Sequence, residues 1–245
     1  MGDSEDNVGS DDINNMINLS QQEIGYSGQI DQLMGSIDAS SVSSQYGDYC
    51  GLRDQLKDKV SLGQGGTVTR AQFDEWNNQL RAAIDGRHAL VQALKQLYLG
   101  KLQQEQTAAN DLRSQLRDKA DRADKVRQAM ADAQLAGDMV SAVMLVHDTI
   151  HALDAGLSYF DEFSDPTAWG LQVGASVSAA EAVESGVQAL GSYSVEEEAV
   201  LQGWGGVADM QEDINTSISA LKDQFKAVQA DAASLGRIDQ LPDDQ

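Results

Sequence analysis

The stretch that decides the fold is residues 69–130, TRAQFDEWNNQLRAAIDGRHALVQALKQLYLGKLQQEQTAANDLRSQLRDKADRADKVRQAM. It contains no proline, and its apolar residues recur at steps of three and four, which places them on one face of an α-helix. Thr69 and Gln72 have the spacing of a capping box, which predicts where the helix starts. Gly86 and Gly100 are the positions at which it would kink, and a break at Gly86 would turn it into a hairpin.

Positive charge is concentrated around this helix. Fourteen of the 17 Lys and Arg residues lie between Arg53 and Arg127. Residues 1–50 contain nine Asp and Glu and no base, and residues 128–221 contain fifteen acids and no base. Because opposite potentials attract, we expect the basic block to dock on acidic helices of the same chain or of a neighbouring subunit.

The composition of the whole chain agrees with a helical protein. Of 245 residues, aromatic residues make up 5%, and there are two prolines. We expect an all-α fold, an elongated helical bundle with long coiled-coil-like helices and an inner helical hairpin. The formal net charge of −22 argues against a nucleic-acid partner, because phosphate binding depends on Lys and Arg.

The pattern also predicts how the chain is divided. First comes a disordered acidic tail (1–12), followed by short helices that are interrupted at Gly25 to Gly28 and end in a glycine loop (13–66). A long central helix ending at Gly137 (67–137) leads to a weakly apolar helical hairpin (138–191), whose second helix starts at Pro166. A coiled-coil helix (192–236), preceded by a capping box at Ser194 and Glu197, and a tail (237–245) complete the chain.

The coiled-coil helix carries the clearest apolar seam of the chain. Its members alternate between steps of four and three residues, as a and d positions do in a heptad repeat. They are Ile214, Ile218, Leu221, Phe225, Val228, Ala232 and Leu235. We expect this interaction seam to pack on the chain itself or on a partner chain.

The second helix of the hairpin carries a stripe of small residues at every fourth position. They are Gly170, Gly174, Ser178, Ala182 and Gly186. Such a stripe permits close helix packing. Insertion of the hairpin into a membrane is the alternative, but Asp148, Asp154, Glu181 and Glu184 lie inside its helices. Each acid costs roughly 2.5–3.5 kcal/mol at the centre of a bilayer, so membrane contact is not favoured.

His147 and His151 lie one turn apart, with Asp154 three residues further on. This spacing is able to hold a metal ion and resembles the HExxH motif, but Asp148 stands where that motif has its Glu. Since both histidines border an apolar face, we expect ordinary histidines at the edge of a packed helix rather than a metal site.

Other chemistry has little support in the pattern. The chain has no nucleophile elbow, P-loop, dinucleotide fingerprint or EF-hand loop, so we expect no catalytic residues and no cofactor. Cys50 is the only cysteine, which excludes an internal disulfide. The first fifteen residues lack the basic and apolar regions of a cleaved secretory signal.

Long helices around a weakly apolar hairpin, one cysteine and an acidic composition resemble the helical proteins exported by bacterial type III secretion systems. That class includes needle-tip, filament and translocator proteins, which self-assemble through coiled coils. The resemblance concerns the layout of residues 13–235 and transfers no individual residue. Trp204-Gly205-Gly206 also resembles the WxG turn of small type VII secreted proteins, which are much shorter than this chain.

These patterns lead us to expect a non-enzymatic assembly or interaction protein with protein partners, self-association foremost. The resemblance implies that a dedicated system exports it to the cell surface or medium from the cytoplasm. An α-helical pore-forming toxin component that inserts residues 138–191 is one alternative. An intracellular scaffold or chaperone-like protein is the other.

Overall fold

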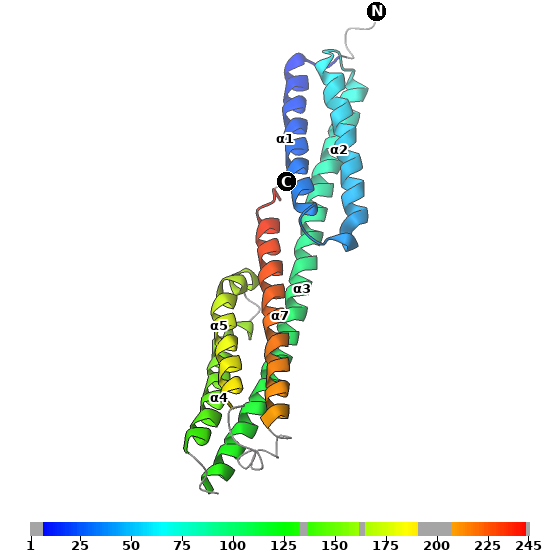
Figure 1. The fold of residues 1–245 in the computed structure, drawn as a ribbon. Coiled ribbons are helices and arrows are strands. Elements are labelled where there is room, and N and C mark those ends of the chain that lie inside the picture. The colour runs from blue at the N-terminus through cyan, green and yellow to red at the C-terminus, as the bar shows by residue number, and fades with distance from the viewer. Residues whose placement is uncertain (1–6, 133–136, 162–164, 191–206, 244–245) are drawn as a thin grey trace, which may run out of the picture. The chain divides into compact units, whose positions relative to one another are not determined.

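The computed structural model describes residues 7–132, 137–161, 165–190 and 207–243. It is an all-α protein, as expected: apart from a single bridge between Asn7 and Thr69, the regular structure of the described residues is helical. The helices are α1 (Ser10–Met34), η1 (Ser40–Val42), α2 (Ser43–Gln64), α3 (Arg70–Asp132), α4 (Gly137–Gly156), η2 (Ser158–Phe160), α5 (Pro166–Leu190) and α7 (Val207–Asp239) (Figure 1).

The chain divides into two compact units. Unit 1 comprises residues 1–98 and 234–245, and unit 2 comprises residues 99–233. Both α3 and α7 contribute residues to each unit. This division differs from the expected one, in which the central helix was a segment of its own.

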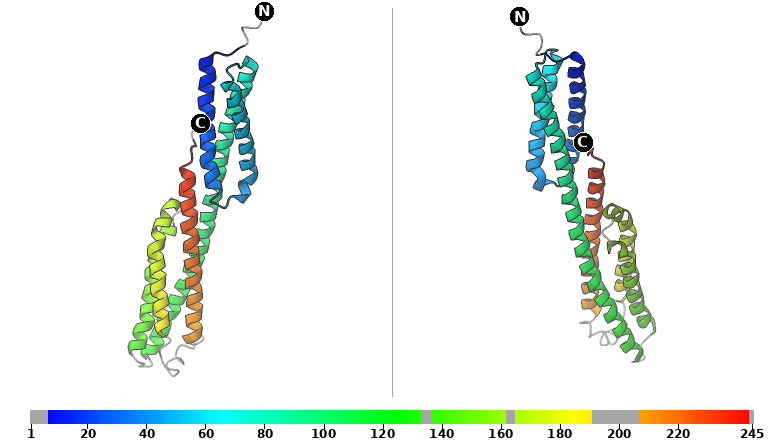
Figure 2. Two further views of the ribbon diagram at one scale, coloured as in Figure 1. Left: turned by 45° about the horizontal axis from the view of Figure 1, so that its top comes forward. Right: turned by 180° about the vertical axis from the view of Figure 1, so that it is seen from behind.

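In unit 1, α1, α2 and the first part of α3 lie side by side, and α2 runs antiparallel to the other two (Figures 1 and 2). Their core surrounds Trp76, whose side chain is fully buried, and includes Met16, Leu56 and Leu80. The N-terminal segment joins this core, because Val8 is buried and its N–H donates to the carbonyl of Val68 at 3.0 Å. The sequence predicted that residues 1–12 form a disordered tail, but the core already includes Val8.

The capping box at the start of α3 is confirmed. The backbone N–H of Gln72 donates to Thr69 Oγ1 at 3.3 Å, and the N–H of Thr69 donates to Gln72 Oε1 at 3.0 Å. The helix continues unbroken through Gly86 and Gly100. Gly86 serves packing instead of bending, because a Cβ there would lie 3.2 Å from Leu52 Cδ1 on α2.

The first two helices are longer than the sequence predicted. Gly25 and Gly28 lie inside a continuous helix of 25 residues, and α2 has 22 residues. A glycine inside a helix costs about 1 kcal/mol relative to alanine, so two of them do not break a helix whose other residues are well packed. Ile30 and Leu33, buried beyond the glycines, supply that packing.

Unit 2 is formed by the remainder of α3, the antiparallel helices α4 and α5, and most of α7, lying side by side (Figures 1 and 2). Phe160 of η2 connects them: its ring centroid is 5.0 Å from that of Trp169 on α5 and 6.4 Å from that of Phe225 on α7. The helix start at Pro166 is confirmed. Gly137, expected to end the central helix, instead opens α4, because α3 already ends at Asp132.

The basic block of α3 docks on the base-free segment of the same chain. In unit 2, Arg113 contacts Asp154 at 2.9 Å and Asp161 at 2.8 Å. Arg117 contacts the second oxygen of Asp154 at 2.7 Å, and Lys119 contacts Asp213 of α7 at 3.3 Å. The segregation of charge along the sequence thus becomes cross-helix ion pairing, as expected for packing within the chain.

We expect Gly63→Ala to destabilise unit 1. A Cβ at Gly63 would lie 2.7 Å from the ring of Trp76, whose side chain is fully buried. Overpacking of this kind costs typically about 1–3 kcal/mol. Gly51→Ala on the same helix is the control: beyond its chain neighbours and its own helix backbone, no atom lies within 4 Å of a Cβ there, so alanine should stabilise the helix by about 0.5–1 kcal/mol. Urea unfolding of both variants measures the difference, and equal stabilities would contradict the packing described.

Candidate functional site

The buried face of α1 changes from apolar to polar side chains halfway along the helix. After Ile13 and Met16, the next three buried positions are Ser20, Glu23 and Ser27. Ser20 accepts a hydrogen bond from Trp76 Nε1 at 2.8 Å. Since buried polar groups need partners, such a run of polar side chains in a helical core marks a place where side chains of other elements converge.

Arg87 of α3 meets this polar stretch. The side chains of Arg87 and Glu23 are only 3% and 4% exposed, and Arg87 Nε donates to both carboxylate oxygens of Glu23, at 3.0 and 3.1 Å. The guanidinium carbon lies 4.8 Å from the ring centroid of Tyr26, which favours a cation. A buried ion pair is tolerable only when its remaining donors and acceptors also find partners.

Two further elements supply those partners. From α2, the Tyr49 hydroxyl donates to Glu23 Oε1 at 3.0 Å. Burial of the ring, followed by the neighbouring charge of Glu23, raises the pKa of Tyr49, so this hydroxyl stays a donor at physiological pH. From the C-terminal segment, the carbonyl oxygen of Pro242 accepts a hydrogen bond from Arg87 Nη1 at 2.5 Å.

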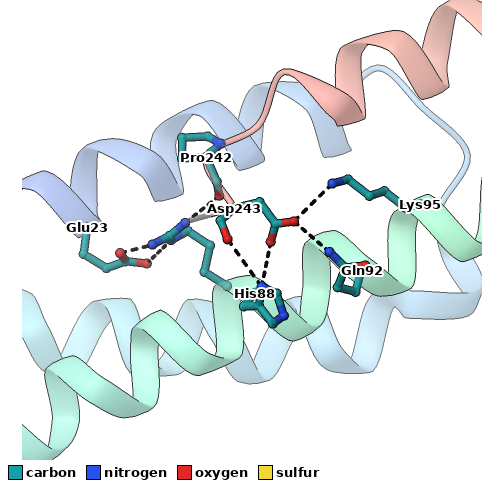
Figure 3. Close-up of polar contacts among 7 residues, drawn as sticks. Glu23, His88, Gln92, Lys95, Pro242 and Asp243 are labelled. Carbon is teal, nitrogen blue, oxygen red and sulfur yellow. Dashed lines mark hydrogen bonds and ion pairs between the residues drawn. The ribbon is translucent and has the colours of Figure 1, made fainter. Parts of the chain in front are cut away.

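The residue after Pro242 is held by the next turns of α3, as Figure 3 shows. His88 Nδ1 lies 2.8 Å from Asp243 Oδ1. Gln92 Nε2 and Lys95 Nζ donate to Oδ2 at 2.7 and 3.1 Å. Because a carboxylate only accepts, His88 Nδ1 must carry the proton in this contact. We call Arg87, His88, Gln92 and Lys95 the tail-binding cluster.

The tail-binding cluster contacts two features of the C-terminal segment, the backbone carbonyl of Pro242 and the acidic side chain of Asp243. Partial burial opposes ionisation of Asp243, but the hydrogen bonds and charges of Lys95 and His88 outweigh it, so the pKa of Asp243 is lowered. The docked carboxylate is therefore ionised at neutral pH, the state in which charge-assisted hydrogen bonds are strongest. The arrangement thus holds the C-terminal segment of this chain on α3.

The suggested metal ligands lie in unit 2 and are engaged in other contacts. The rings of His147 and His151 are 4.5 Å apart, and His147 Nδ1 is 2.9 Å from Asp148. Both oxygens of Asp154 are bound, by Arg113 and Arg117. Within the described ranges no group of three His, Cys, Asp or Glu side chains is placed to hold a metal ion.

The interaction seam of α7 faces the interior of this chain. Ile214, Ile218, Leu221, Phe225 and Val228 are buried in unit 2, and Leu235 is buried in unit 1. A heptad pattern shows that a stripe is apolar but not which chain covers it. Here the chain covers its own seam, which leaves any self-association to other surfaces.

The small-residue stripe of α5 is largely exposed, unlike the interaction seam of α7. Gly174, Ser178 and Ala182 are exposed, whereas a Cβ placed on Gly186 would lie 3.6 Å from Val146 Cγ2 of α4. The side chains that α5 buries are on its other face, Trp169, Val173 and Val183 among them. The environment of Gly170 and the Ser194–Glu197 capping box lie outside what the structure describes.

The hairpin of α4 and α5 contains a hollow of about 260 Å³. Small side chains line most of it, together with Tyr159 and Gln172. The hydroxyls of Tyr159 and Ser176 lie 3.0 Å apart and satisfy each other. None of the helices in the described parts of the chain is both long and apolar enough to cross a membrane.

Comparison of the chain with known proteins gives no relative. No protein-family model, curated protein or solved structure matches it. The site must therefore be interpreted from its own chemistry.

The sequence held a signal for part of this site that periodicity alone did not bring out. Arg87 occupies a buried position of α3 between Ala83 and Leu90, so it is a charge within an apolar stripe, whereas Glu23 lies on α1 between the buried Ser20 and Ser27. A charge within an apolar stripe indicates a buried partner of opposite charge on a neighbouring helix. For Asp243 no pattern exists, because the tail has no helical period.

We expect Tyr49→Phe to destabilise unit 1 by about 1–3 kcal/mol. The variant removes the hydroxyl that donates to the buried carboxylate of Glu23, and hydrogen bonds to charged groups contribute about that much. Tyr26→Phe is the matched control, since among the described residues its hydroxyl bonds only the exposed Gln22 side chain, and its ring stays over Arg87. Urea unfolding should leave the control within about 0.5 kcal/mol of wild type. Equal losses in both variants would argue against the buried network.

Proposed function

We propose that this chain is a non-enzymatic helical protein that works by binding other protein chains. The observation that supports it best is the tail-binding cluster, in which four side chains of one helix donate to a carbonyl and a carboxylate of a peptide segment. Donors fixed in this way distinguish an acidic peptide from a neutral one. The chemistry of these four donors suits binding rather than catalysis. Each donor holds an oxygen of the peptide segment, and none is paired with a nucleophile.

The partner we propose is an acidic segment that follows a proline, such as the chain's own Pro242-Asp243. The site is filled by the chain's own tail, which a covalent link keeps at a high local concentration. A second copy carries the same tail, so exchange of tails between copies is the simplest form of self-association. A different protein with a similar segment would compete for the same donors.

The cellular setting we propose follows the resemblance in layout. It is an exported bacterial assembly component of the type III tip, filament or translocator kind, built as an elongated bundle of long coiled-coil-like helices. The α4–α5 hairpin is the element that an α-helical pore-forming protein would insert, and leakage of liposomes at neutral and mildly acidic pH tests that alternative. For an intracellular scaffold, the same peptide site would serve.

A direct test uses a peptide of residues 240–245, QLPDDQ, and a chain that ends at Asp239, the last residue of α7. We expect binding with a Kd on the order of 1 mM or tighter. NMR shift changes should centre on His88, Gln92 and Lys95. The full-length chain should bind the peptide several-fold more weakly, because its own tail occupies the site.

The matched control peptide replaces Asp243 by Asn and should bind several-fold more weakly. Because docking lowers the pKa of Asp243 from 3.8, binding should be at full strength above that pH and be lost as the pH falls below it. Equal affinity for the two peptides, or no binding to a folded truncated chain, would contradict the proposed function.

A further inference from the structure

The C-terminal segment of unit 1 docks by more than its Pro-Asp end. Residues 234–245 belong to unit 1, and this stretch has three buried apolar side chains, Leu235, Ile238 and Leu241, spaced three residues apart. The N–H of Leu241 donates to the carbonyl of Ile238 at 3.0 Å, which continues the helical turns past the end of α7. Because residues three apart in such turns share a face, the segment presents an apolar face ahead of its acid.

Two helices hold the two ends of this segment. Beyond the end of α1, Ser36 Oγ accepts a hydrogen bond from Arg237 Nη1 at 2.9 Å and donates to the carbonyl of Leu33 at 2.9 Å. On α3, the tail-binding cluster holds the other end (Figure 3). The same stretches of the two helices bury apolar side chains, Leu33 on α1 and Val91 and Leu94 on α3. We call these stretches, with the tail-binding cluster, the segment-binding face.

The connectivity of the chain makes the segment separable from the rest of unit 1. Unit 1 comprises residues 1–98 and 234–245, and residues 99–233, which form unit 2, lie between them in the chain. The segment is therefore joined covalently to the rest of unit 1 only through unit 2. Exchange of an identical element between two copies replaces each contact by the same contact, so it costs little. A second copy is the partner that reproduces all the contacts of the segment.

We propose that the segment-binding face accepts residues 234–243 of a second copy in place of its own, as a short amphipathic helix that ends in Pro-Asp. This inference rests on the proposed function and defines its ligand more closely, because it adds an apolar helical face to the acid. Burial of large apolar side chains supplies most of the affinity in such helix-in-groove binding. The contacts to the carbonyl and the carboxylate fix the register and the direction of the segment.

The first experiment measures binding of a labelled peptide of residues 234–245, SLGRIDQLPDDQ, to full-length chains by fluorescence anisotropy. The variant Ile238→Asp carries a charge at a buried position of its own segment, so its segment-binding face should be vacant. The wild-type chain should bind the peptide at least about tenfold more weakly than this variant, because its own segment competes at a high local concentration. Leu241→Asp is a second host with a vacant face, and circular dichroism checks that both hosts remain helical.

Two altered peptides test the apolar face. The Ile238→Ser peptide should bind about tenfold or more weakly, because it loses the burial of a large apolar side chain. The Gln240→Ser peptide is the matched control and should bind like the parent, since Gln240 is exposed. Equal affinity of the parent and Ile238→Ser peptides, with QLPDDQ still binding, would overturn this inference and leave the proposed function intact. Failure of both the parent peptide and QLPDDQ would overturn both.

The second experiment tests the second copy as the partner. Full-length Ile238→Asp offers a vacant face, and full-length Lys95→Asp holds its own segment weakly, because the new carboxylate repels Asp243. Light scattering of the mixture should show a dimer that neither variant forms alone. A mixture that remains monomeric although the peptide binds would assign the face to a different protein chain and overturn the proposed exchange.

Discussion

Unit 1 depends on one constraint, the need to satisfy a guanidinium group that is taken out of water. The side chain of Arg87 is 3% exposed, and an arginine does not lose its proton at accessible pH. Each neighbouring element contributes to its environment: Glu23 and Tyr26 from α1, Tyr49 from α2 through Glu23, and the carbonyl of Pro242. The positions of three helices and a tail are thereby linked to a single charge. A core of apolar side chains alone would specify this arrangement less strictly, because apolar contacts have no direction.

The same constraint explains why a peptide site exists at this place. Once Arg87 has bound Glu23 through Nε, its Nη1 still points a donor at the segment that passes over α3. The following turns of α3 extend this recognition with His88, Gln92 and Lys95. In unit 2, Arg113 and Arg117 likewise bind acids on neighbouring elements.

Much of the fold was accessible from the sequence, because helical periodicity and caps are local signals. The all-α class, the Thr69–Gln72 capping box and the helix start at Pro166 were all predicted correctly. The lengths of α1 and α2 were not, since glycine signals a local cost but says nothing of the tertiary packing that offsets it. Arg87 was detectable as a charge inside an apolar stripe of α3, whereas Glu23 lies between two buried serines of α1. The docking of Asp243 was not detectable, because it joins residues 148–155 positions apart that share no pattern.

The most direct measurement is a double-mutant cycle between Glu23 and Arg87, with urea unfolding of Glu23→Gln, Arg87→Met and the double variant. Each single change leaves a buried charge without its partner, whereas the double change removes both charges, so the losses should be far from additive. We predict a coupling free energy of about 2 kcal/mol or more, the size found for close charge pairs. A coupling within about 0.5 kcal/mol of zero, as for independent sites, would contradict the claim that this pair organises unit 1.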